Sequence, residues 1–143
     1  MSRRIAEAAT EADRAACLAL RIEVFCGEQD VTRDEEIDGL DAAARHLLAT
    51  VDGTPAGTLR LRFMGKAAKI ERVCVARAHR GTGLGAALMR EGLRVAADAG
   101  ATEAWLGAQV AVIPFYERLG FAAQGPEYLD ARIPHRNMTR PLP

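Results

Sequence analysis

Residues 70–100 read IERVCVARAHRGTGLGAALMREGLRVAADAG, and this stretch decides the fold. It opens with a compact apolar strand, Ile70 to Ala76, and continues into RGTGLG at residues 80–85, which places glycine at three alternate positions. A helical pattern then runs to Gly100. Alternate glycines allow positive φ angles and a close approach to the main chain. The stretch therefore predicts a nest of backbone N–H groups at a helix N-terminus, beside Arg80, that binds an anion such as a pyrophosphate.

Two other phosphate-binding loops are excluded by their spacing. A P-loop requires a glycine followed by Lys-Ser or Lys-Thr, and no glycine in this chain is followed in that way. The dinucleotide fingerprint Gly-x-Gly-x-x-Gly differs from the observed Gly81, Gly83 and Gly85, and the strand has about seventy residues ahead of it. A glycine-rich helix cap without a ligand remains the structural alternative.

RGTGLG resembles the Arg/Gln-x-x-Gly-x-Gly/Ala motif of the GNAT superfamily of N-acetyltransferases, and a later block agrees with it. Ala108-Gln109 followed by FYERLGF at residues 115–121 is similar to the late strand–helix–strand segment of that family. The resemblance implies an α/β fold with a mixed central sheet flanked by helices, in a single domain over residues 1–143. It also implies acetyl-CoA as cosubstrate.

The family's cofactor contacts can be carried over to matching positions. In the family the central strand splays from its neighbour, and its backbone meets the pantetheine and thioester while the glycine loop holds the pyrophosphate. The positions so implied are Val73, Cys74, Val75, Arg80, Gly81, Thr82, Gly83, Leu84, Gly85 and Ala86, together with Gln109, where many relatives carry an asparagine. Val73 and Val75 can be core residues at the same time, because the ligand uses the main chain. Cys74 is expected to be a small core residue rather than a nucleophile, since no His or Asp lies beside it in the sequence.

Two side chains are candidates for proton transfer. The resemblance makes Tyr116 the general acid, and the spacing of Phe115 and Leu119 predicts that these two face the core while Tyr116 turns to an adjacent face. Its alternative is an aromatic residue at the edge of the core. Glu71 has the strand parity of Val73 and is a candidate general base. Glu71 could equally pair with Arg60 or Arg62 on the neighbouring strand.

Both ends of the chain resemble a bacterial subgroup, the ElaA/YjcF-like acetyltransferases. The matching segments are RIEVFCGEQ at residues 21–29, DEEIDGLD at 34–41 with His46, and GPEYLD at 125–130 with IPH at 133–135. The polar residues expected nearest the acceptor are Glu28, Gln29, Glu127 and His135. His135 is either a base near neutral pH or a hydrogen-bonded structural histidine. The acidic loop from Asp30 to Asp41, with six carboxylates, either attracts an amine or is a solvated loop.

The composition narrows the binding partners and the cellular compartment that are expected for this chain. The 143 residues include 19 basic and 19 acidic side chains, so the net charge gives no footprint for nucleic acid or an anionic membrane. The N-terminus lacks an apolar leader and no segment is long enough to span a membrane, which predicts a cytoplasmic protein. Three cysteines without CxxC spacing are expected to be reduced, and the scattered histidines predict no metal site. The sequence allows a homodimer without requiring one.

An alternation of strands and helices follows from the periodicity. Strands are expected at Ile5–Ala9, His46–Val51, Ala56–Met64, Ile70–Ala76, Glu103–Gly107, from Phe121 onward and at Arg132–Thr139, and helices at Thr10–Phe25, Gly83–Ala99 and Pro114–Leu119. Within the third strand the alternation predicts one deeply buried face.

The sequence thus predicts an N-acetyltransferase that moves the acetyl group of acetyl-CoA to a primary amine of a small molecule, by direct attack in a ternary complex. One alternative acceptor is a protein lysine or N-terminus. The other alternative is a non-catalytic acyl-CoA-binding or sensing module on the same fold.

Overall fold

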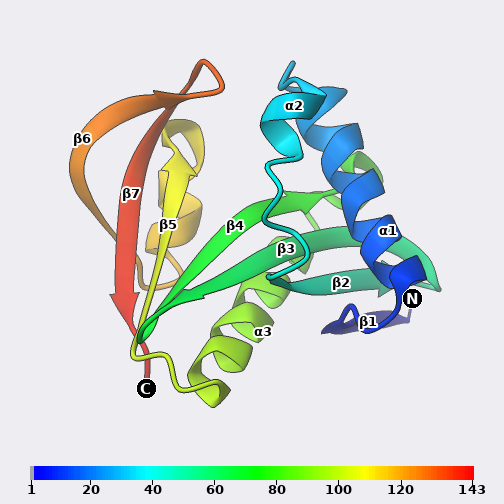
Figure 1. Cartoon of the computed structure of the whole chain (residues 1–143), viewed down its shortest axis with the longest axis horizontal. Helices are drawn as coiled ribbons and strands as arrows, with labels where there is room; N and C mark the ends of the chain where they lie inside the picture. The colour runs from blue at the N-terminus through cyan, green and yellow to red at the C-terminus, as the bar shows by residue number, and fades with distance from the viewer. Residues whose placement is uncertain (1) are drawn as a thin grey trace.

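A seven-stranded mixed sheet forms the centre of the protein, whose computed structural model describes residues 2–143 (Figure 1). The strand order across the sheet is β1-β2-β3-β4-β5-β7-β6, and within the described residues β4 and β5 are the one parallel pair. The strands are β1 (Arg3–Glu7), β2 (Arg45–Val51), β3 (Thr54–Met64), β4 (Ala67–Val75), β5 (Glu103–Gln109), β6 (Ala122–Asp130) and β7 (Ile133–Pro141). The helices are α1 (Glu11–Arg21), α2 (Arg33–Glu36), α3 (Leu84–Asp98) and α4 (Ile113–Glu117). The predicted mixed sheet with flanking helices is confirmed.

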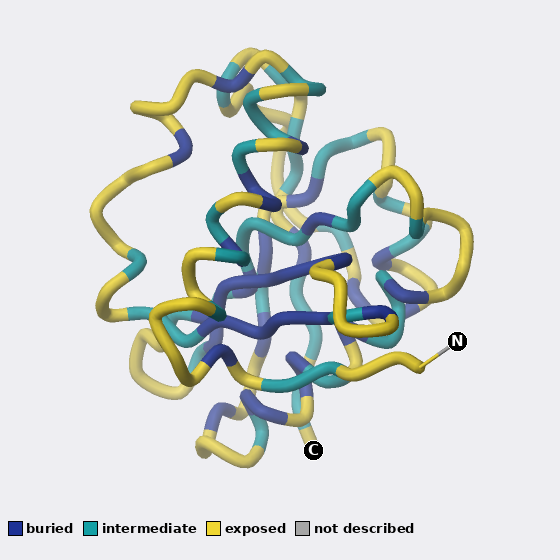
Figure 2. The backbone as a smooth tube through the Cα atoms, turned by 90° about the vertical axis from the view of Figure 1, so that its right-hand side faces the viewer, coloured by how far each residue is buried: buried dark blue, intermediate teal, exposed yellow. Residues whose placement is uncertain are grey.

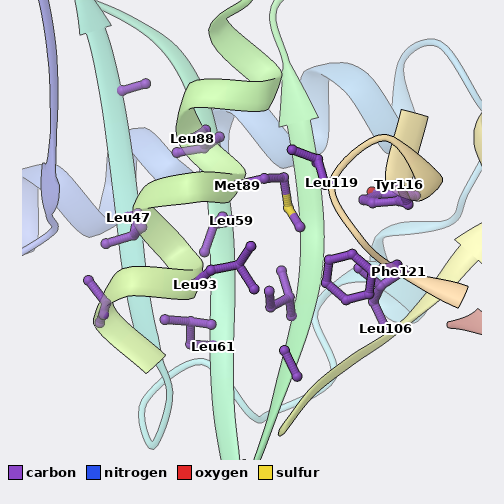
Figure 3. Close-up of a cluster of buried hydrophobic side chains, with 14 of the residues drawn as sticks. Leu47, Leu59, Leu61, Leu88, Met89, Leu93, Leu106, Tyr116, Leu119 and Phe121 are labelled. Carbon is purple, nitrogen blue, oxygen red and sulfur yellow. The ribbon is translucent and has the colours of Figure 1, made fainter. Parts of the chain in front are cut away.

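Helices cover both faces of the sheet. α3 packs on one face, where Leu59 of β3 and Leu88 of α3 belong to the main buried cluster (Figure 3). α1 packs on the opposite face, where Leu20 belongs to a second cluster with Cys74 of β4. The central strands are therefore buried on both sides, with exposed turns around them (Figure 2).

β4 and β5 pair only at their beginnings. Their ladder joins Ala67 to Glu103 and ends at Lys69, opposite Trp105. Beyond that point the two strands diverge, as Figure 1 shows, and β5 continues its pairing with β7 alone. The second half of β4 consequently has unpaired backbone groups along the edge that faces β5. The expected splay around Val73 to Val75 is present.

A β-bulge interrupts β4 at the same place. Thr58 of β3 lies opposite Cys74 and Arg60 lies opposite Glu71, so β4 carries one extra residue over this interval. Arg72 has a φ of 56°, in the left-handed region. The extra residue turns Glu71 to the α1 face, whereas Val73 packs against the cluster under α3. The prediction that these two residues share a strand face was wrong, because a bulge shifts the alternation by one.

Three local features also differ from the sequence prediction. The helix expected through Phe25 ends as α1 at Arg21 and continues as a π-helical turn, Ile22–Cys26. Helix α2 was not predicted; the side chain and backbone of Thr32 form a reciprocal capping box with Glu35. The polar face of β3 is as deeply buried as its apolar face, since Arg60 is fully inaccessible. The remaining expected helices and strands lie within a few residues of their predicted bounds.

Candidate active site

The glycine loop forms the predicted nest at the start of α3. Gly81 and Gly83 have φ angles of 75° and 84°, a conformation that other residues adopt only with strain. Gly83 is the N-cap of the 15-residue helix α3 and supplies no side-chain cap, so the first N–H groups of the helix are available to an anion. Arg80 borders the loop and donates from Nε to the carbonyl oxygen of Val75 at 2.9 Å. The arrangement suits a pyrophosphate.

A cavity of about 720 Å³ runs from this nest into the gap between β4 and β5. Thirteen of the predicted site residues line it: Gln29, Glu71, Val73, Cys74, Val75, Arg80, Gly81, Gly83, Gly85, Ala86, Gln109, Tyr116 and His135. Four do not: Glu28, Thr82, Leu84 and Glu127. Thr82 instead donates its hydroxyl to the His79 carbonyl at 2.6 Å, and Leu84 is a core residue. Glu127 is exposed on β6.

Tyr116 lies in the wall of the cavity with its ring among aromatic neighbours. Its ring meets Phe115 and Phe121 edge to face, at centroid distances of 5.0 Å and 6.1 Å. Phe115 is half-buried and packs against the main cluster, as predicted, but Tyr116 is itself a buried member of that cluster, so the prediction that it turns to an adjacent face was wrong. Burial raises the pKa of Tyr116 to about 12. Its hydroxyl is therefore a proton donor, and it makes no hydrogen bond to any other described residue.

Glu71 is held by three cations. Its carboxylate lies 3.0 Å from Arg60 Nη2, 2.6 Å from Arg62 Nε and 3.2 Å from Lys69 Nζ. Burial raises the pKa of Glu71, but the hydrogen bond from Arg62 and the charges of Arg60 and Lys69 outweigh it and lower the pKa to about 2. Such a carboxylate is a weak base. The pairing alternative for Glu71 is the one that the geometry favours.

The adjacent residues Glu28 and Gln29 contact the glycine loop and the end of β5, respectively. Glu28 accepts from Arg80 at 2.8 Å and lies 3.6 Å from Arg77. Gln29 accepts from Gln109 Nε2 at 2.8 Å, which joins the segment after the π-helical turn to the end of β5. Gln29 borders the cavity as expected, whereas Glu28 pairs with the loop arginine rather than facing an acceptor.

His135 and Tyr128 form a stacked pair at the other end of the cavity. Their ring centroids are 5.8 Å apart and the planes differ by 22°. His135 Nδ1 lies 2.7 Å from the Ile133 carbonyl oxygen, which can only accept a hydrogen bond. Nδ1 therefore carries the proton in this contact, and in the neutral ring Nε2 is left as an acceptor. This is the tautomer that a general base requires.

Tyr128 was missed as a site residue, and so was Arg72. Tyr128 and His135 are opposite each other because Ala131 and Arg132 form a two-residue turn between β6 and β7. Both turn residues have positive φ without being glycine, so the usual hairpin signal was absent. A two-residue turn predicted at Ala131 and Arg132 would have placed Tyr128 opposite His135. Arg72 reaches the cavity through the bulge, which the sequence does not mark.

The acidic loop from Asp30 to Asp41 is exposed over most of its length, as the solvated alternative predicts, but it is not a free negative patch. Its carboxylates pair with arginines: Glu35 with Arg132, Glu36 with Arg21 and Arg72, Asp38 with Arg60 and Arg72, and Asp41 with Arg21 and Arg60. Arg21 and Arg60 are fully buried. The loop is therefore fastened to β3 and β4 by ion pairs, and most of its charge is neutralised.

Cys74 agrees with its expected place in the core. It is 5% exposed, and burial raises the pKa of its thiol to about 12. A thiol in that state is a poor nucleophile. Across residues 2–143 no three His, Cys, Asp or Glu side chains are grouped as a metal ion would need, and no helix is both long and apolar enough to cross a membrane.

Comparison with known proteins gives consistent matches over most of the chain. The model of the acetyltransferase (GNAT) family matches residues 8–121. The uncharacterised N-acetyltransferase YjcF of Bacillus subtilis is 38% identical over 122 residues, which are 85% of this chain and 87% of that protein. An acyl-CoA N-acyltransferase from Pseudomonas aeruginosa is 35% identical with a TM-score of 0.87, covering 97% of this chain and 99% of the other. Escherichia coli ElaA has the same TM-score and coverage at 27% identity.

Proposed function

We propose that this chain, which belongs to the acetyltransferase (GNAT) family and is an acyl-CoA-dependent acetyltransferase, transfers the acetyl group of acetyl-CoA to the primary amine of a small molecule. The observation that carries the proposal is the glycine nest at the N-terminus of α3, which opens directly into the unpaired gap between β4 and β5. The nest suits a pyrophosphate, and the unpaired edge of β4 suits an extended amide-containing arm.

We assign a residue of this chain to each step of the transfer. Acetyl-CoA supplies a thioester whose carbonyl carbon forms the new C–N bond while its C–S bond breaks. His135 Nε2 takes the proton that the attacking nitrogen must lose. Backbone N–H groups on the free edge of β4, around Val73, stabilise the negative charge that develops on the carbonyl oxygen. The Tyr116 hydroxyl donates a hydrogen bond to the departing sulfur.

The high pKa of Tyr116 limits what it does for that sulfur. A reference thiol has a pKa near 8.5, so moving the whole proton from a phenol at about 12 is uphill by about 5 kcal/mol. Tyr116 therefore shares its proton through a hydrogen bond and does not lose it ahead of C–S cleavage. The thiolate takes its proton from solvent after it leaves.

A bridge at the acceptor end supports a small acceptor over a protein. Arg132 in the β6–β7 turn pairs with Glu35 of α2 at 3.0 Å and donates to the Asp30 carbonyl at 3.0 Å. Glu35 lines the cavity, and so does Ala131, which is next to Arg132 in the turn. The Arg132–Glu35 ion pair therefore joins two walls of the cavity. The hydrogen bond from Arg132 lowers the pKa of Glu35 to about 2. A folded protein surface would have to open this bridge, whereas a small amine would not.

Thiol release from acetyl-CoA, with mass analysis of the amine, tests the proposal. We expect free CoA to appear only with an amine present, in equal amount to a product that is heavier by one acetyl group. Acetylation of added proteins or peptides but of no small amine would favour a protein acceptor. Binding of acetyl-CoA without CoA release for any amine would favour the non-catalytic module.

A further inference from the structure

The acceptor end of the cavity contains a fixed aromatic platform. Tyr128 stacks on His135, and its hydroxyl donates to Asn137 Oδ1 at 2.8 Å. To make that bond the side chain extends from β6 across β7 to Gly107 of β5, where any Cβ would overlap the Tyr128 hydroxyl. Contacts at both ends of the side chain thus fix the ring, which is 38% exposed and borders the cavity.

The charges around this platform are already paired. The cavity is lined by the carboxylates of Glu35, Glu36 and Glu71, and each forms an ion pair with an arginine or lysine. Asp130 is the one lining carboxylate that makes no ion pair within residues 2–143. A polycationic acceptor needs several free carboxylates, and it would have to displace guanidinium groups here. One free carboxylate suits a single ammonium.

Apolar side chains line the cavity alongside the polar Gln29, Gln109 and His135. Phe25 and Val31 face the cavity from the segment before α2, and Ile133 and Ala131 face it from β7 and the turn. These side chains and the Tyr128 ring favour an apolar body over a sugar or a peptide backbone, whose polar groups would lose their hydrogen bonds to water.

We propose that the acceptor is a monoamine with an aromatic ring, an arylalkylamine, whose ring stacks on Tyr128. This inference rests on the proposed acetyl transfer only for its location in the acceptor end of the cavity. Aromatic stacking contributes a preference of about 3- to 10-fold over an aliphatic group of similar size. Asp130, which is exposed and lines the cavity, attracts the ammonium.

Equilibrium binding of amines to the CoA-saturated protein tests the inference without turnover. The probes are 2-phenylethylamine, 2-cyclohexylethylamine, butylamine and spermidine, titrated by calorimetry. We expect 2-phenylethylamine to bind at least about threefold more tightly than the cyclohexyl compound and about tenfold more tightly than butylamine or spermidine. Equal affinity for the two ring compounds, or tighter binding of spermidine, would overturn the inference.

Variants at Tyr128 and Gly107 test whether the preference for an aromatic amine comes from the Tyr128 ring. Tyr128→Leu, which keeps the apolar bulk, should weaken the binding of 2-phenylethylamine by about 3- to 10-fold and leave the affinity for butylamine unchanged. Gly107→Ala keeps the tyrosine but displaces its hydroxyl, and the same selective loss is expected. Leu129→Ala is the control, since Leu129 is the next residue on β6, is 72% exposed and does not line the cavity. Unchanged selectivity in both Tyr128→Leu and Gly107→Ala would contradict a platform at Tyr128.

The inference and the proposed function can fail separately. If 2-phenylethylamine binds on Tyr128 but no amine releases CoA from acetyl-CoA, the aromatic ligand site stands and the catalytic proposal fails. If CoA is released with spermidine or butylamine and the ring compounds are no better, the catalytic proposal stands and the acceptor class is wrong.

Discussion

At the scale of single residues, Tyr116 combines a buried ring with a hydroxyl that makes no hydrogen bond within residues 2–143. We expect Tyr116→Phe to lower kcat by about 100-fold, because the departing sulfur loses its hydrogen-bond donor. The ring and its packing remain, so the Kd for CoA should stay within about threefold. Steady-state thiol release and calorimetry measure the two quantities. A kcat within threefold of wild type would remove Tyr116 from the mechanism.

We expect Glu28 to compete with the cosubstrate for Arg80. Its carboxylate lies 2.8 Å from the Arg80 guanidinium, which the pyrophosphate would otherwise bind. Glu28→Gln should therefore tighten CoA binding by about 2- to 5-fold at low salt, the range of a partly exposed ion pair. Glu127→Gln removes the same charge from an exposed position outside the cavity and should leave the Kd unchanged. Weaker binding in Glu28→Gln would mean that Glu28 supports the site rather than competing for it.

Site residues that act through their backbone geometry were easier to predict from the sequence than site residues that act through the direction of their side chains. The nest at Gly81 and Gly83 follows from glycine itself, since few other residues adopt those φ angles. The face of Glu71 depends on a bulge centred on Arg72, and an arginine at positive φ has no sequence signal. For the same reason the pairing of Tyr128 with His135, set by a turn without glycine, could not be predicted from composition.

At the scale of elements, an ion-pair network fastens the segment after α2 to β3. Arg60 is fully buried and bonds to Asp38, Asp41 and Glu71. Arg60→Met should lower the free energy of unfolding by about 3–5 kcal/mol, because it leaves three partly buried carboxylates without their shared cation. Arg62→Met is the control: within residues 2–143 Arg62 forms an ion pair only with Glu71, its side chain is 26% exposed, and a loss of about 1 kcal/mol or less is expected. Urea denaturation compares them, and equal losses would contradict a central role for Arg60.

Elements with strong periodicity were predicted, and elements that depend on distant partners were not. α3 and β4 arise from long periodic stretches of sequence, and each stretch ends at a glycine or a turn that the sequence marks clearly. The alternation in β3 predicted solvent on the arginine face, but α1 and the acidic loop cover that face and pair its charges. Such pairing joins residues about twenty positions apart or more, so local pattern could not reveal it.

At the scale of the whole molecule, the ion pairs around Arg60 and Glu71 make the free energy of unfolding depend on pH. The pKa of Glu71 is about 2 in the folded protein, below its ordinary value of 4.5, so the unfolded chain binds more protons between these values. The stabilisation from Glu71 is thus fully present above about pH 4.5 and is lost as the pH falls toward 2.

The difference in unfolding free energy between wild type and Glu71→Gln should follow that window. We expect it to shrink by about 3 kcal/mol from pH 5 to pH 2, measured by urea denaturation at each pH. A difference that does not change with pH would show that Glu71 is not held ionised by its arginines.

The central claim is that the nest at the start of α3 holds the pyrophosphate of acetyl-CoA, and calorimetric titration of Gly83→Asp with acetyl-CoA tests it most directly. Gly100→Asp is the matched control, because Gly100 has a similar φ of 95° but lies at the opposite end of α3. We expect wild type and Gly100→Asp to bind within about threefold of each other, and Gly83→Asp to bind about 100-fold more weakly because its carboxylate occupies the anion site. No binding to the wild type, or equal binding to Gly83→Asp, would contradict the account.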